Sequence, residues 1–139
     1  EIGKSAFDAI GGDKCTSQLL NSPANFTASK LKWVKENEPE VYKQIHKFML
    51  PGDYIAYKFS NQINTTISGL SEGVFWDFKN DSIANFLLDH YGVSQSLIPD
   101  IVETFGLQSV VDEKGEAESS IAAGTPIYYR AGNQIMLYL

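Results

Sequence analysis

The spacing of the apolar residues changes about halfway along the chain. Up to residue 60 they recur every three or four positions in short runs, which is the spacing of amphipathic helices. From Thr65 onward many of them gather in β-branched and aromatic runs, which are typical of strands. The sequence therefore predicts an α/β fold with a helix-rich first half and its strands in the second half.

Glycine divides the first helical stretch. The segment Lys4–Leu20 is interrupted at Gly11-Gly12, so it is expected to form two short helical pieces. Their candidate core residues are Phe7, Ile10, Leu19 and Leu20.

Proline divides the second helical stretch. A helix from Thr27 is expected to stop near Asn37, because Pro39 disfavours helical backbone just before it and suits the first turn of a new helix. In that new helix the apolar residues would share one face; they are Val41, Ile45, Phe48 and Met49. The segment 50–53 ends it, and Asp53 is expected to cap one more short helix through Tyr57.

Two strands and a helix are predicted next. Residues 65–68 and 74–78 would form a hairpin-like unit around Gly69 and Gly73. A helix from Asp81 or Ser82 is expected to stop at Gly92. The residues expected to be buried on this helix are Ile83, Phe86, Leu87 and Tyr91.

The last third is predicted to contain little regular structure before its final strand. An irregular segment includes Phe105, and a tight polar turn follows at 112–115. The run 125–131 is expected to be a buried strand entered through the edge residue Pro126.

Length and composition exclude several classes of protein. The 139 residues suit a single unit over 1–139, and neither a repeat nor a linker interrupts them. The 17 acidic against 11 basic residues, a net charge of −6, argue against nucleic acid as a partner. A single cysteine, Cys15, cannot form an internal disulfide. No apolar run approaches a membrane span and no signal peptide begins the chain, so we expect no membrane partner and a cytoplasmic location.

Common catalytic and metal-binding motifs are absent from the sequence. His46 and His90 lie on predicted helices without a second ligand at metal-binding spacing, so no metal site is predicted. Cys15 is interpreted as an inert, partly buried thiol and not as a nucleophile. The aromatic run 75–78 could stack on a sugar, but packing in the core is the favoured interpretation.

Several segments together resemble one family of enzymes. The run Asn25–Asn37, NFTASKLKWVKEN, followed by EPEVY, resembles the first signature of the FGGY carbohydrate kinases. At the spacing of that family follow LPGDYI (50–55), Thr66-x-Ser68 and FWD (75–77). Farther on, AGTP (123–126) leads to Gly132-Asn133-Gln134, where the family has a Gly-Asp-Gln/Asn motif. The chain is identified as a member of this family over nearly its whole length.

The resemblance implies a fold and a reaction. The fold is part of a ribonuclease-H-like (actin-like ATPase) domain, namely a partial N-terminal, sugar-binding domain. The reaction is transfer of a phosphoryl group from ATP, with Mg²⁺, to a small-molecule sugar. The family's Asp-x-Gly-Thr phosphate loop does not occur in the 139 residues, so we expect the isolated chain to be inactive and to hold no cofactor-binding residue of its own.

The resemblance also implies three site residues. Asn133 stands where the family has the aspartate that accepts the proton of the sugar hydroxyl, and an amide cannot take up that proton at neutral pH. Gln134 matches the neighbouring sugar-contacting position, and Asn25 falls where related kinases place a substrate-contacting side chain. The expected substrate-binding residues are therefore Asn133, Gln134 and Asn25.

The last five residues depart from the family. After the motif the family continues with small residues, whereas Ile135–Leu139 are bulky and apolar. A DNA stretch encoding Asn-Asn-Ala-Leu-Ser-Leu, read one base late, yields Ile-Met-Leu-Tyr-Leu. We expect a frameshift or a truncated reading frame near Asn133, and we expect the isolated chain to be marginally stable or to associate with itself as a homo-oligomer.

Three functions stay open on the sequence. The first is a fragment of a kinase that phosphorylates D-xylulose in pentose catabolism, the sugar of the members that it resembles most. The second is another kinase of the family, acting on ribulose, gluconate or glycerol. The third is a non-catalytic sugar-binding or interaction module, which Asn133 favours.

Overall fold

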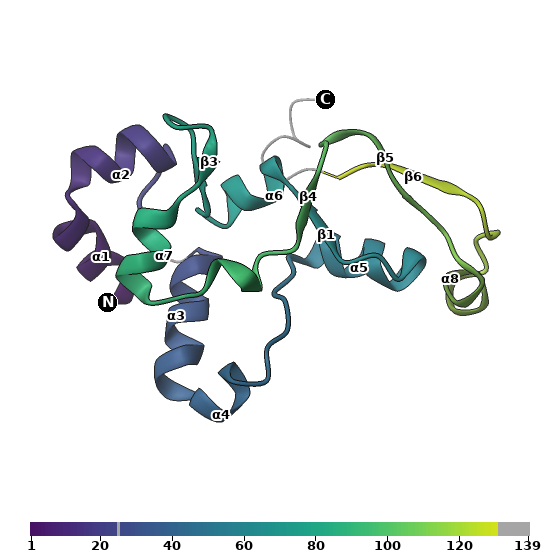
Figure 1. The fold of residues 1–139 in the computed structure, drawn as a ribbon, viewed down its shortest axis with the longest axis horizontal. Helices are drawn as coiled ribbons and strands as arrows, with labels where there is room; N and C mark the ends of the chain where they lie inside the picture. Colours follow the sequence, from purple (N-terminus) through teal and green to yellow (C-terminus); the bar gives the residue numbers. More distant parts are fainter. Residues whose placement is uncertain (25, 131–139) are drawn as a thin grey trace. The chain divides into compact units, whose positions relative to one another are not determined.

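The computed structural model describes residues 1–24 and 26–130 (Figure 1). They form two compact units, each made of two stretches of chain. Unit 1 comprises Glu1–Phe48 with Leu70–Ile98, and unit 2 comprises Met49–Gly69 with the described residues from Pro99 onward. A single domain can contain two such compact units. The prediction that residues 1–139 form one domain therefore stays a prediction.

Unit 1 consists mainly of helices. Its elements are α1 (Ile2–Ile10), α2 (Gly12–Leu19), α3 (Thr27–Asn37), α4 (Pro39–Tyr42), β2 (Trp76–Asp77), β3 (Ser82–Ile83), α7 (Asn85–Tyr91) and the 3-10 helix η1 (Gln95–Leu97). The short strands β2 and β3 pair antiparallel, with Trp76 opposite Ile83.

Unit 2 contains the longer strands. Its elements are α5 (Pro51–Ser60), β1 (Asn64–Thr66), β4 (Asp100–Val102), β5 (Phe105–Val110), α8 (Glu113–Ser119) and β6 (Pro126–Tyr129). Strands β1 and β4 pair in parallel, and β5 and β6 pair antiparallel with a shift in register between Phe105 and Ser109. Helix α6 (Ile67–Glu72) begins in unit 2 and ends in unit 1.

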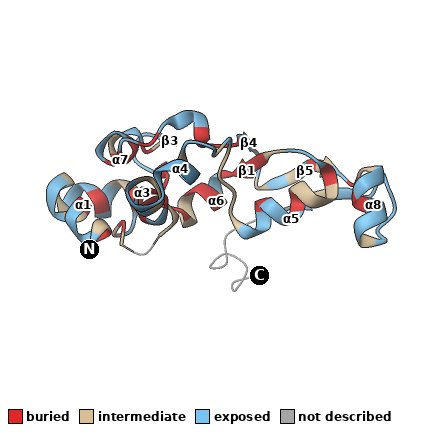
Figure 2. Ribbon diagram, turned by 90° about the horizontal axis from the view of Figure 1, so that it is seen from below, coloured by how far each residue is buried: buried red, intermediate tan, exposed pale blue. Residues whose placement is uncertain are grey.

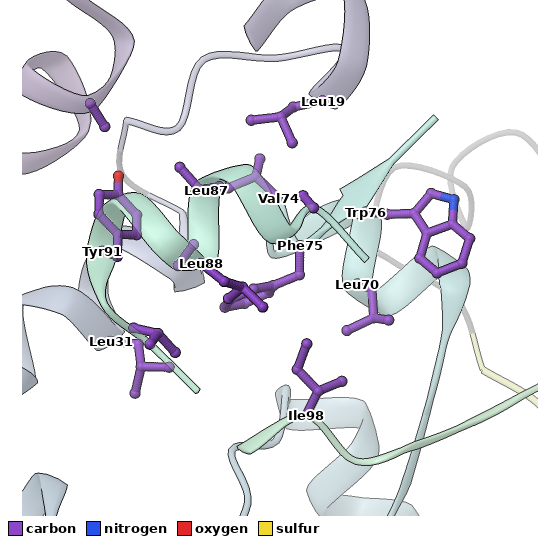
Figure 3. Close-up of a cluster of buried hydrophobic side chains, with 14 of the residues drawn as sticks. Leu19, Leu31, Leu70, Val74, Phe75, Trp76, Leu87, Leu88, Tyr91 and Ile98 are labelled. Atoms are coloured by element: carbon purple, nitrogen blue, oxygen red, sulfur yellow. The ribbon is translucent and has the colours of Figure 1, made fainter. Parts of the chain in front are cut away.

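The core of unit 1 is built around Phe75, which is 1% exposed (Figure 3). The Phe48 ring stacks on it at a centroid distance of 4.6 Å. Tyr91, fully buried, has its hydroxyl 2.8 Å from the hydroxyl of Ser29, so its polar end is satisfied. Burying one large apolar side chain contributes about 1.5–3 kcal/mol. The buried apolar side chains around Phe75 are therefore the main source of stability in unit 1.

In unit 2 exposed residues predominate on α8, whereas α5 carries exposed, intermediate and buried residues (Figure 2). On α5 the buried residues are Asp53, Ala56 and Ser60. Asp112 is the N-cap of α8, and its backbone N–H donates to Phe59 O at 2.9 Å, which joins the two helices.

The breaks in the helical half are confirmed. Gly11 separates α1 from α2 with φ of 102°, a conformation that favours glycine. Glu38 separates α3 from α4, which has Pro39 at its first position. Gly92 ends α7 in the left-handed conformation, as predicted. The final strand is also confirmed, with Pro126–Tyr129 as its bounds. Its predicted burial is wrong, because Pro126 and Tyr128 are exposed and Ile127 is half-buried.

Several other predictions of local structure are wrong. The helix after Pro39 has four residues, because the following segment turns away to make tertiary contacts: Phe48 N–H donates to Leu97 O at 3.0 Å. Ile45 and Phe48 still pack on the core of unit 1. Leu20 was expected in the core, but it takes a left-handed backbone conformation after α2 and is 62% exposed.

The predicted hairpin over 65–78 is wrong as well. Helix α6 separates the two runs, and the Oγ1 of Thr66 accepts from Gly69 N–H at 3.1 Å at the start of that helix. Strand β1 pairs with β4 and β2 pairs with β3, so neither run pairs with the other.

The pairing of Ser82-Ile83 in β3 delays the start of α7 to Asn85. Phe105, expected in an irregular segment, begins β5. The predicted turn at 112–115 is the start of α8, because the Asp112 carboxylate accepts from Gly115 N–H at 2.7 Å and begins a helix. Asp53, expected as a cap, lies at the third position of α5.

Candidate functional site

The most concentrated polar chemistry among the described residues lies at the end of β6, around Arg130. Arg130 is the only arginine of the chain. Its side chain is 9% exposed, and its Nε donates to Asp53 Oδ1 at 3.0 Å. Its Nη2 donates to the backbone oxygen of Asn64 at 3.1 Å and to the Asn64 Oδ1 at 2.5 Å. We call Arg130, Asp53, Asn64 and Thr65 the Arg130 cluster.

Helix α5 places the carboxylate of this cluster. Pro51 opens the helix and needs no hydrogen-bond partner for its nitrogen. Asp53 Oδ2 accepts from the Leu50 N–H at 3.2 Å, which satisfies a donor at the helix start. The same oxygen accepts from Thr65 Oγ1 at 2.9 Å, so α5 and β1 hold the carboxylate together.

Strand β1 supplies the remaining partners. Asn64 also donates from Nδ2 to Gln108 O at 3.4 Å, which links β1 to β5. Thr66 Oγ1 donates to the backbone oxygen of Arg130 at 3.3 Å. Both the side chain and the backbone of Arg130 are therefore held by neighbouring elements of unit 2.

The electrostatics of the cluster are those of a buried ion pair. Burial raises the pKa of the Asp53 carboxyl above its usual value, and the hydrogen bond from Thr65 and the charge of Arg130 partly oppose this. Nη1 of Arg130 is buried, and among residues 1–24 and 26–130 no acceptor reaches it. A carboxylate that is 4% exposed and already accepts three hydrogen bonds has no free path to a substrate. The cluster thus serves to hold the end of β6.

All three site residues predicted from the sequence lie outside the described residues. They are Asn25, Asn133 and Gln134. The structure therefore tests neither their positions nor their roles. The nearest described residues are Phe26, the residue just before α3, and Arg130, three positions before Asn133.

The other side chains considered on the sequence have clear environments. Cys15 is buried, and burial raises the pKa of its thiol, in accord with an inert thiol. Phe75 and Trp76 are buried in the core, whereas Phe78 is 40% exposed. His90 is exposed on α7, and His46 is exposed but lies outside any helix, contrary to its prediction.

Within the described part of the chain, no group of three or more His, Cys, Asp or Glu could hold a metal ion. None of the helices in the same part is long and apolar enough to span a bilayer.

Comparison with known sequences identifies the family. Residues 13–139 match the N-terminal domain of the FGGY family of carbohydrate kinases, so the chain belongs to this family. It is 31% identical over 108 residues to a xylulose kinase of Staphylococcus xylosus, an alignment that covers 78% of this chain and 22% of that protein. It is 26% identical over 131 residues to a xylulose kinase of Lactococcus lactis, covering 91% of this chain and 24% of that protein. The chain thus spans about a quarter of the length of the curated relatives it matches.

Comparison with solved structures agrees on the fold. A xylulose kinase from Rhodospirillum rubrum superposes with a TM-score of 0.84 at 19% identity, over 97% of this chain and 28% of that one. A glycerol kinase from Plasmodium falciparum superposes with a TM-score of 0.79 at 14% identity, over 96% of this chain and 28% of that one. The predicted fold class is confirmed: the chain is α/β and part of a ribonuclease-H-like (actin-like ATPase) domain, with helices in its first half and strands in its second.

The Arg130 cluster is not among the sites predicted from the sequence. Its outermost members, Asp53 and Arg130, are 77 positions apart along the chain, and no local pattern joins them. The one available signal was that the single arginine, among 11 basic residues, lies within a strand predicted to be buried. Arginine is the residue best suited to a buried, forked ion pair, so its position could have been noted.

Proposed function

We propose that the whole protein is an ATP-dependent kinase that phosphorylates a ketose, with D-xylulose as its first candidate substrate. The observation that carries this proposal is the match of residues 13–139 to the N-terminal domain of the FGGY carbohydrate kinases. Xylulose kinases among the relatives support the choice of sugar. ATP and Mg²⁺ would be held by parts of the protein other than the described residues, and we expect it to act in the cytoplasm.

The proposed role of Asn133 makes the reaction testable. In the family's Gly-Asp-Gln/Asn motif the aspartate would accept the proton of the sugar hydroxyl as its oxygen attacks the γ-phosphate. Asn133 can donate and accept hydrogen bonds but cannot take up this proton. Gln134 would contact the sugar. Asn25 is also proposed to contact the sugar, because the segment that begins with it resembles the first signature of the family.

The experiment compares the full-length protein with its Asn133→Asp variant. Release of ADP is measured with D-xylulose, ribulose, gluconate and glycerol. Loss of a general base typically lowers turnover by about 10²–10⁴-fold, so Asn133→Asp should raise turnover by that factor and leave the Kd of the sugar nearly unchanged. Equal turnover of the two proteins on every sugar would show that position 133 does not bear the base. No turnover of any sugar by either protein would refute the proposed reaction.

The amide at position 133 favours one other function, a sugar-binding module without catalysis. Calorimetry with the same four sugars distinguishes it. Such a module would bind a sugar, yet neither Asn133 nor Asn133→Asp would turn it over. Another kinase of the family would instead show its highest turnover with ribulose, gluconate or glycerol.

A further inference from the structure

We draw no further inference here: the strongest candidate, the exposed apolar side chains of the β5–β6 sheet in unit 2, among them Leu107, Val110 and Tyr128, carries no proposal because nothing in the structure shows what covers them.

Discussion

Gly115 of α8 lies close to the backbone of α5, and a single methyl group there should separate the two helices. A Cβ added at Gly115 would meet Phe59 O at 2.0 Å and Phe59 C at 2.7 Å. These are backbone atoms of α5, so they cannot turn aside as a flexible side chain could. To reach an ordinary contact distance, α8 must move away by more than about 1 Å.

Two effects of opposite sign decide the outcome of Gly115→Ala. Alanine in place of glycine favours a helix by about 0.5–1 kcal/mol. Overpacking at a close contact typically costs about 1–3 kcal/mol. The movement also lengthens the 2.9 Å hydrogen bond from Asp112 N–H to Phe59 O, which contributes about 1 kcal/mol when intact. The losses exceed the gain, and we expect a net loss of about 1–3 kcal/mol in the free energy of unfolding.

Urea unfolding of the 139-residue chain, followed by circular dichroism at 222 nm, measures this change. Gly52→Ala is the matched control, because it is also a helical glycine but its nearest neighbour is Arg130 Cγ at 3.5 Å, an ordinary contact. Gly52→Ala should leave the stability unchanged or raise it by up to about 1 kcal/mol. A Gly115→Ala chain that is as stable as the wild type would refute the close approach of α8 to α5.

Two further predictions concern titrating groups. Burial raises the pKa of Asp53 above its ordinary 3.8, so the folded state binds the carboxyl proton of Asp53 more tightly than the unfolded state does. The stabilisation that results from this proton is fully present below pH 3.8 and is lost as pH rises through the pKa of the folded state. The stability of the wild type relative to Asp53→Asn should accordingly increase as urea titrations are moved from pH 7 toward pH 4, and a decrease would mean that the attraction of Arg130 outweighs burial. The buried Cys15 thiol, whose pKa burial raises, should react with iodoacetamide at pH 8 at least about tenfold more slowly in the folded chain than in urea. Equal rates in the two conditions would contradict its burial.

Several helix boundaries could be predicted from the sequence because their signals are local. Gly11, Pro39 and Gly92 act on the backbone within one turn of their own positions, and they separate or end helices where expected. The strand at Pro126–Tyr129 is likewise marked by its own β-branched and aromatic residues.

The pairing of the strands could not be predicted in this way. Residues 64–66 pair with 100–102, and nothing in either segment identifies the other. The segment after Tyr42 has a helical pattern, yet Phe48 bonds to Leu97 instead, and a tertiary contact overrides the local preference. The Arg130 cluster also depends on tertiary contacts, because α5 and β1 are far from Arg130 in the sequence and contact it only in the folded chain. Asn25, Asn133 and Gln134 stay predictions drawn from the resemblance to the family.

The order in which the chain is synthesised bears on how its two discontinuous units can form. Residues 1–48 are made before Phe75, Leu87 and Tyr91, which complete their core. In the same way, strand β1 is made before β4, with which it pairs, and α5 is made before Arg130, which pairs with its Asp53. Closing such long loops costs conformational entropy before the contacts between the two ends contribute any stabilising free energy. A ribosome that pauses between residues 50 and 70 would therefore hold a chain in which the early helices contact one another but lack Phe75, Leu87 and Tyr91. The apolar surface left exposed in such a nascent chain would depend on chaperones until these residues are made.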